Sequence, residues 1–221
     1  MRIFLRNGVI TDKPEEVILQ YYNEMGKGVR AYDAESLPPD NQFPREQLLD
    51  ARRLANRLGG RGIPEKAIDS LCTRQTRIEK ILEEVPFTTT ILDGKAHIPW
   101  KSITDLFEAF RVPYVTMSRY TKMLHKKRPA LIPILDSRVR DDYFPPTIPK
   151  GTMTGLSDAE KATYFVKEVE KDISKNREVL LALHEWQGKP FSISIVRIFD
   201  ILVWCRFGPP SFRPRFAYLY R

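Results

Sequence analysis

Apolar residues recur at helical spacing through most of the chain. The first such stripe lies in 14–25, where Pro14 suits a first helical turn and Gly26 follows as a stop. The clearest stripe of the first half lies in 44–58. Together the stripes predict helices at 14–25, 44–58, 64–72, 74–84, from Ser102 to Phe110, from Thr116 or Ser118 to Lys127, from Asp136 onward, and at 157–173, 177–187 and 192–206.

Turn signals between these stripes predict the connections. Asn7-Gly8 inside an alternating segment predicts a small β-hairpin at 2–12, and Asp93-Gly94 predicts a second at 87–98, with a structured loop as the alternative. Loops are expected at 32–43 and at the Pro- and Gly-rich 144–156, and the tail from Gly208 should be irregular. The pairs Ser102/Asp105 and Ser157/Glu160 have the spacing of capping boxes, which favours helix starts there.

The order of these elements fixes the expected fold class. Strands never alternate with helices as in βαβ units, so a doubly wound sheet is not expected. We predict a mainly α, multi-helix single domain over 1–221 with one or two short β-hairpins. A two-lobed arrangement with a hinge near 144–156 is an alternative, because that segment is the longest predicted connection.

Composition narrows the function classes only slightly. The chain has 36 Lys and Arg against 28 Asp and Glu, a formal net charge of +8, which suits a polyanion such as DNA as a partner. Solvated surface cations explain the same balance. Two isolated cysteines and three histidines without ligand spacing predict no metal site and no other cofactor.

The apolar segments are too short or too interrupted for a membrane protein. The N-terminal apolar stretch is shorter than a signal peptide needs, and the longest one, 191–205, contains Arg197 and Asp200. We therefore expect no membrane association and a cytoplasmic location.

Segment 112–142 carries the strongest functional signal. In its first helix, Met117, Tyr120, Met123 and Leu124 recur at helical spacing, so one side should be buried and the other should expose cations. These cations could contact nucleic-acid phosphates. The candidates are Arg119, Lys122, Lys126, Lys127 and Arg128, with Arg138 in the following helix. His125 could join them or simply be packed.

Asp136 stands between an apolar run, 131–135, and the start of a helix. An aspartate at this position commonly caps the helix, because its carboxylate accepts hydrogen bonds from the free N–H groups of the first turn. It could also project into a cleft near Arg119, Lys122 and Arg138. There a carboxylate can stabilise developing positive charge or activate water. The two interpretations are compatible.

The order of short loop, helix, extended apolar run, Asp136-Ser137 and helix resembles the helix-hairpin-helix DNA glycosylases. That resemblance implies the glycosylase fold and Asp136 as the catalytic carboxylate. The family's glycine-rich turn is replaced here by 112–116, which has no glycine, and its Thr-His after the aspartate is replaced by Ser137-Arg138. The phrases SRYTKMLHKKRPALIPILDSRV and SIVRIFDILVW also resemble an uncharacterised bacterial family of unknown function.

Three further features have both a structural and a functional interpretation. Tyr114 and Tyr120 could stack on a base, although aromatic residues are more often packed in a core. Arg197 and Asp200 should form an ion pair within one helix, with Asp200 as a second carboxylate of the cleft in the alternative view. The arginines at 52, 53, 57 and 61 fit either a solvated face or phosphate contacts.

Two functional hypotheses follow. The first is a nucleic-acid-binding protein of glycosylase-like fold with base-excision activity centred on Asp136. The second is a non-enzymatic helical module that binds a protein or another polyanion. The missing glycine turn favours the second, whereas the setting of Asp136 and the positive charge favour the first.

Overall fold

The structure is a computed structural model, and it describes residues 1–58, 62–94, 97–144 and 152–221. At Arg138 it describes the helical backbone but not the side chain. The described residues are mainly helical with one small sheet, as the periodicity predicts. The α-helices are α1 Pro14–Glu24, α2 Lys27–Ala34, α3 Arg45–Arg57, α4 Glu65–Cys72, α5 Gln75–Glu84, α6 Trp100–Ala109, α7 Met117–Lys127, α8 Ser137–Tyr143, α9 Asp158–Lys175, α10 Arg177–Glu185, α11 Ile195–Phe207 and α12 Arg213–Phe216.

The predicted hairpin at 2–12 is confirmed. Strands β1 (Ile3–Phe4) and β2 (Ile10–Thr11) pair antiparallel, with Ile3 opposite Thr11. The turn between them places Asn7 at φ 61° and Gly8 at φ 73°, a left-handed conformation that Asn and Gly adopt more readily than other residues. The second hairpin is wrong: the described residues of 87–98 form turns, and Ile91 N–H donates to the Ala130 carbonyl instead of to a partner strand.

Other differences arise at helix ends. The capping box at Ser157 and Glu160 is present, with both reciprocal hydrogen bonds formed. The one expected at Ser102 is absent, because α6 begins at Trp100 and the Ser102 hydroxyl donates to Glu84. The sequence also missed α2, which follows α1 directly after the Met25-Gly26 link, and the short α12 in the tail.

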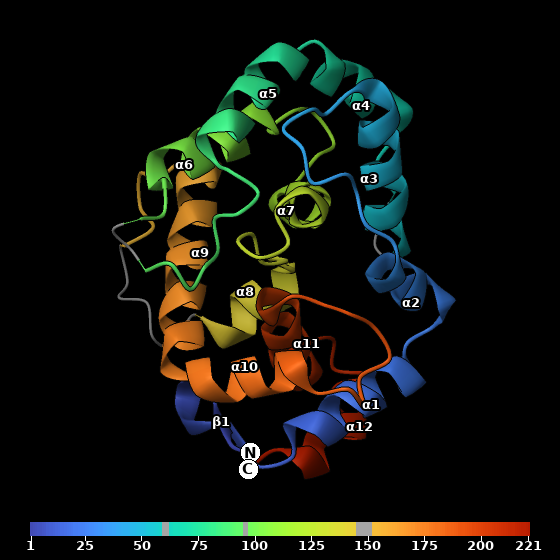
Figure 1. Cartoon of the computed structure of the whole chain (residues 1–221), viewed down its shortest axis with the longest axis vertical. Helices are drawn as coiled ribbons and strands as arrows, with labels where there is room; N and C mark the ends of the chain where they lie inside the picture. Colours follow the sequence, from blue (N-terminus) through green and yellow to red (C-terminus); the bar gives the residue numbers. More distant parts are fainter. Residues whose placement is uncertain (59–61, 95–96, 145–151) are drawn as a thin grey trace.

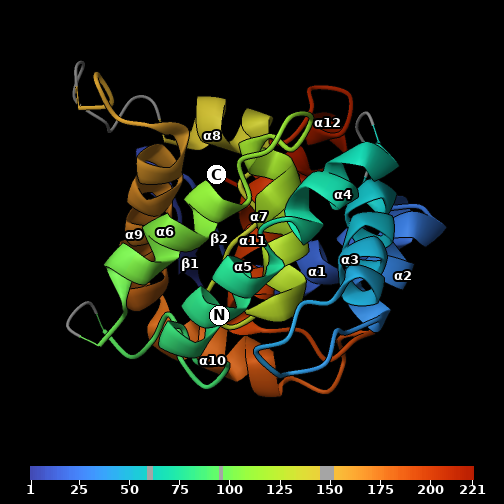
Figure 2. The same cartoon turned by 90° about the horizontal axis from the view of Figure 1, so that it is seen from above.

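Helix α7 lies at the centre of the molecule, with the other helices around it (Figure 1). It packs against α3 and α9, while α11 lies beneath it and contacts α1, α8, α10 and α12 (Figure 2). Most of the buried hydrophobic residues form one large cluster that extends from Ile3 to Leu219, and Tyr32, Leu54 and Ile134 form a small second one. This packing surrounds the basic segment of the sequence with protein.

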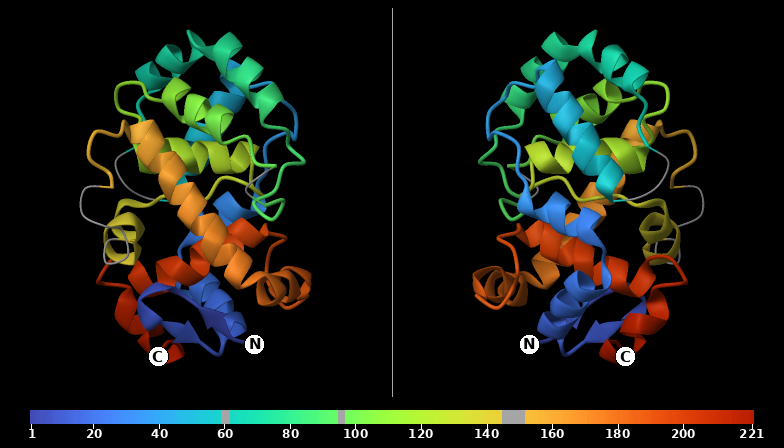
Figure 3. Two further views of the ribbon diagram at one scale, coloured as in Figure 1. Left: turned by 90° about the vertical axis from the view of Figure 1, so that its left-hand side faces the viewer. Right: turned by 90° about the vertical axis from the view of Figure 1, so that its right-hand side faces the viewer.

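The two ends of the chain lie side by side (Figure 3). Backbone hydrogen bonds of 2.9 Å join Ile10 and Arg221 in both directions, which extends the hairpin by one more segment. The single-domain organisation and the hinge near 144–156 stay predictions, and 145–151 lies outside the described residues. No helix in the described part of the chain combines the length and the apolarity that crossing a bilayer requires.

Candidate functional site

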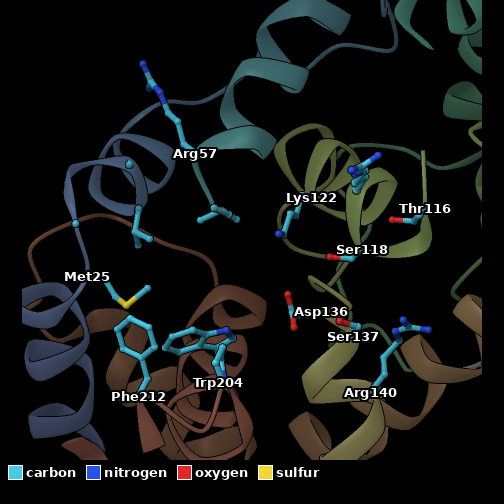
Figure 4. Close-up of a pocket in the computed structure, with 16 residues that line it drawn as sticks. Met25, Arg57, Thr116, Ser118, Lys122, Asp136, Ser137, Arg140, Trp204 and Phe212 are labelled. Carbon is cyan, nitrogen blue, oxygen red and sulfur yellow. The ribbon is translucent and has the colours of Figure 1, made fainter. Parts of the chain in front are cut away.

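A cavity with a volume of about 720 Å³ lies where five parts of the chain converge (Figure 4). These parts are the link from α1 to α2, the end of α3, the first half of α7, the start of α8 and the segment from α11 to α12. Residues from 25 to 212 in the sequence thus line one pocket, and its volume suits a small organic ligand or a nucleobase.

One wall of the pocket is apolar. Met25, Trp204 and Phe212 lie together on this side in Figure 4. The Trp204 and Phe212 rings are 5.5 Å apart between centroids and inclined by 54°. Both side chains are only partly buried, so they offer an aromatic surface to a ligand. The sequence offers no reason to expect these residues at a site, because a single methionine or aromatic side chain outside a motif does not mark one.

Asp136 projects from the opposite side into the same space, near Ser118, Ser137 and Lys122 (Figure 4). Arg119 and Lys122, two of the cations expected near Asp136 at a cleft, line the same pocket. The side chain of the third, Arg138, is not described, and the role of Asp136 stays a prediction. Asp136 stands directly before α8, and its carbonyl accepts the Arg140 N–H at 2.9 Å.

The backbone before Asp136 is held by hydrogen bonds as well as by apolar burial. Ile134 N–H donates to the Asp200 carboxylate at 2.9 Å, and Leu135 N–H donates to the Thr121 hydroxyl at 3.1 Å. Leu131, Ile132 and Leu135 are almost completely buried. This setting fixes where the Asp136 carboxylate can lie.

The pocket is also lined by four cations in different states. Arg57 is directed away from the centre of the pocket in Figure 4 and pairs with Glu35. Arg119 donates to the Tyr114 carbonyl. Lys122 is 6% exposed; burial lowers the pKa of its ammonium, and the nearby Asp136 opposes that shift. The buried Nε of Arg140 has no hydrogen-bond partner among the described residues.

The expectation that α7 exposes its cations is wrong. Lys122, Lys126 and Lys127 are all buried, and so is Arg128, which follows the helix. Burial lowers the pKa of Lys126 to about 8 and that of Arg128 to about 10, because the charged forms lose water. Lys126, Lys127 and Arg128 are therefore not on a surface that nucleic-acid phosphates can reach.

Lys126, Lys127 and Arg128 donate hydrogen bonds to other segments of the protein. Lys126 donates to the Tyr32 and Glu35 carbonyls at the end of α2, and Lys127 donates to Asp40, Gln47 and the Pro38 carbonyl. Arg128 donates to the Leu82 and Val85 carbonyls and to Asn41. The basic run at 126–128 thus anchors the end of α2, the loop 35–43 that follows it, and the end of α5. Roles of Arg119 and Arg138 at phosphates stay predictions.

The two tyrosines proposed for base stacking have different surroundings. Tyr120 is 1% exposed and packs against Phe107, with ring centroids 5.4 Å apart, so stacking on a ligand is wrong for this residue. Tyr114 is 53% exposed, and its hydroxyl accepts a hydrogen bond from Lys66 at 2.9 Å. Its φ of 71° shows that the α6–α7 turn adopts a left-handed conformation without glycine.

The predicted pair of Arg197 and Asp200 is also wrong. Arg197 donates two hydrogen bonds to Asp33, at 2.8 and 3.0 Å, and a third to the Tyr21 hydroxyl. Asp200 accepts the Ile134 N–H instead, and loss of water around it raises its carboxyl pKa to about 7. The sequence could not show this, because Asp33 is 164 positions from Arg197.

The remaining candidate residues that the structure describes make contacts within the protein. Arg52 donates to the Ile63 carbonyl, and Arg53 pairs with Glu35; position 61 lies outside the described residues. His125 is buried, its Nδ1 is 2.6 Å from the Ile132 carbonyl, and burial lowers its pKa to about 3. Within the described chain, no three His, Cys, Asp or Glu side chains are arranged to hold a metal ion.

The comparison with protein families gives one result. A family model described as "Family of unknown function (DUF6308)" matches residues 15–206, which is most of the chain. The chain belongs to this family. The match spans every wall of the pocket except Pro209 and Phe212. No curated protein and no solved structure has significant similarity to the chain.

Proposed function

We propose that this DUF6308 member is a nucleic-acid-binding protein of DNA-glycosylase-like fold that takes one nucleotide out of the helix into the pocket and excises its base. The observation that carries the proposal is the pocket's two-sided character. A partly exposed aromatic surface, Trp204 and Phe212, lies across from the carboxylate of Asp136 and several cations. A nucleotide has groups that suit both sides, because its base can stack on the aromatic surface and its phosphates can contact the cations.

The volume of the pocket and the energy of stacking on its aromatic residues are both suitable for a flipped-out nucleotide. A cavity of about 720 Å³ can enclose a base and its sugar. Stacking on an aromatic side chain stabilises a base by about 1–3 kcal/mol, which is similar to the cost of unstacking it from the duplex. Arg119 and the exposed Tyr114 lie at the α6–α7 turn beside the pocket, where they could contact the strand.

Asp136 is the proposed catalytic carboxylate. As the bond between the base and C1′ of the sugar breaks, positive charge develops on the sugar, and a fixed carboxylate stabilises it. The base leaves with the bonding electrons, and a water molecule then adds its oxygen to C1′ and gives one proton to the carboxylate. That proton passes on to the departed base, so the products are the free base and a sugar hydroxyl, and the carboxylate is regenerated. The buried run 131–135 and its hydrogen bonds would hold the carboxylate in place for this step.

A non-enzymatic polyanion-binding or protein-binding module is the second candidate. The burial of Lys126, Lys127 and Arg128 favours it, because the predicted basic face of α7 is used inside the protein. Both candidates predict a binding partner, but only the first predicts a chemical product.

The test compares two carboxylates of the same helix region. Asp136→Asn keeps the shape and most of the capping ability of the side chain but removes the charge. The exposed Asp141 offers the matched control, Asp141→Asn. We expect the parent and the control to release bases from a panel of duplexes with modified bases, and Asp136→Asn to be at least about 100-fold slower with unchanged DNA affinity.

Each result separates the candidates. Binding of DNA with no product from any substrate would support the non-enzymatic module, and equal excision by Asp136→Asn would remove the catalytic role. If the parent does not bind DNA even at low salt, the proposal is wrong.

A further inference from the structure

The buried cations of α7 differ in their hydrogen-bond acceptors. Lys126 and Lys127 each donate to two or more oxygens of the protein, and Arg128, which follows them, donates to several more. The Lys122 side chain is buried to a similar degree, but its ammonium makes no hydrogen bond to the protein in the described part of the chain, and the carboxylate that acts on its charge is the nearby Asp136. It is also the buried α7 cation that lines the pocket, and Figure 4 shows it directed into the open space.

A second donor on the same side is also without an acceptor. Arg140 lines the pocket, and its Nε is buried with no hydrogen-bond partner among the described residues. Asp136 is the one carboxylate among the described lining residues, so donors exceed charged acceptors on this wall. Buried donors are almost always satisfied in folded proteins. The Lys122 ammonium faces the pocket, so a ligand that displaces water from it is expected to supply acceptor oxygens in place of that water.

If the ligand is a nucleobase, the need for an acceptor oxygen distinguishes bases with a carbonyl group from bases with an amino group at the same ring position. Uracil and hypoxanthine carry a carbonyl oxygen where cytosine and adenine carry an amino group. A carbonyl oxygen accepts a hydrogen bond from an ammonium, whereas an amino group presents a second donor to it and leaves both groups unpaired.

We propose that Lys122 is a specificity-determining residue that selects bases with a carbonyl oxygen over their amino counterparts. This inference rests on the proposed function, because it assumes that the pocket holds a base. Lys122 would donate to the carbonyl oxygen while the ring packs on Trp204 and Phe212. Sites that hydrogen-bond a substrate group reject analogues lacking that group strongly, since the buried protein group is then left unpaired.

The experiment measures binding to matched bases that are not paired in the duplex. The target position holds uracil, cytosine, hypoxanthine or adenine opposite a stable abasic analogue, so the cost of unpairing is the same for each. A 2′-fluoro group on the target sugar slows cleavage during the measurement. Uridine and cytidine monophosphates are titrated in parallel, since they test the pocket without a duplex.

The variants are Lys122→Met and a control, Lys101→Met. Methionine keeps the length and apolar stem of lysine but donates no hydrogen bond. Lys101 is an exposed lysine of α6 whose side chain is 89% exposed and pairs with Asp105. Thermal unfolding of both variants checks that they fold.

We expect the parent and Lys101→Met to bind uracil and hypoxanthine about tenfold or more tightly than cytosine and adenine. Lys122→Met should lose this preference, mainly through weaker binding of the carbonyl bases. A parent without the preference, or a preference that survives Lys122→Met, would overturn the inference while leaving DNA binding established. A Lys122-dependent preference for uridine monophosphate without any duplex binding would support the inference and refute a nucleic-acid substrate.

Discussion

At the scale of single residues, hydrogen-bond partners decide what a charged side chain can do. Lys122 and Lys126 are four positions apart on α7 and are both buried. Lys126 is held by two carbonyls, so it stabilises the fold, whereas Lys122 keeps its donors for the pocket. Asp200 shows the same principle for a carboxylate, because its main contact is a single backbone N–H.

Asp200 should make stability depend on pH. Its pKa is raised from 3.8 to about 7 in the folded protein, so folding takes up a proton between these values. The free energy of unfolding should therefore fall as the pH rises from about 4 to about 7 and then level off. Asp200→Asn stays neutral and can still accept the Ile134 N–H, so this decrease should become smaller.

Urea denaturation of the parent and Asp200→Asn at several pH values between about 4.5 and 8 measures the effect. Other titrating groups contribute equally to both proteins and cancel in the difference. Parallel stability profiles would contradict the assignment, and the variant should be the more stable protein relative to the parent at about pH 8.

At the scale of elements, the pocket depends on how closely α2 approaches the end of α3. A methyl group on Gly28 would lie 2.6 Å from the Arg57 carbonyl oxygen, which is shorter than any normal contact. Gly26, two residues earlier, has open space around its Cα. Both glycines line the pocket, so the pair separates the effect of packing from the effect of the added methyl group.

We expect Gly28→Ala to lower the free energy of unfolding by about 1–3 kcal/mol, because the two backbones must move apart. This loss should exceed the gain of about 1 kcal/mol that alanine brings to a helix interior. Gly26→Ala should change stability by less than about 0.5 kcal/mol. Chemical denaturation measures both, and a Gly28→Ala protein more stable than the parent would show that α2 can shift freely.

At the scale of the whole molecule, a buried polar cluster joins α1 and α2, at the start of the chain, to α11 near its end. Arg197 of α11 binds Asp33 of α2 and the Tyr21 hydroxyl of α1, and Tyr22 donates to the same Asp33 at 2.9 Å. Arg197 also lines a small cavity of about 40 Å³ that shares Lys122 and Asp136 with the main pocket. The cluster therefore supports the floor of the site.

Removing one partner of this buried pair should be costly. Arg197→Met should lower the free energy of unfolding by about 3–5 kcal/mol, because Asp33 is left as a buried charge without its partner. Adding Asp33→Leu should restore part of the loss, since the double variant contains no unpaired charge. Denaturation of the two single variants and the double variant gives the coupling energy, and additive losses would contradict a direct pair.

The sequence by itself determined most of the local structure. Apolar periodicity located ten of the helices within a few residues, Asn7-Gly8 located the hairpin, and the run 131–135 located the backbone before Asp136. These features depend on neighbours in the sequence, through helix hydrogen bonds, turn conformations and caps. The position of Asp136 directly before a helix could be predicted for the same reason, whereas the cleft beside it could not, because distant segments form it.

Only the tertiary structure decided which charges are available and which residues complete the pocket. The basic run of α7 has the pattern of an exposed face, but α3, the end of α2 and the loop 35–43 pack over it. Carbonyls from these distant segments accept the hydrogen bonds of its cations. Trp204 and Phe212 reach the pocket through the packing of α11 and α12, and Arg197 finds Asp33 across 164 positions. Such partners are set by the whole fold, since contacts between distant segments leave no spacing in the sequence.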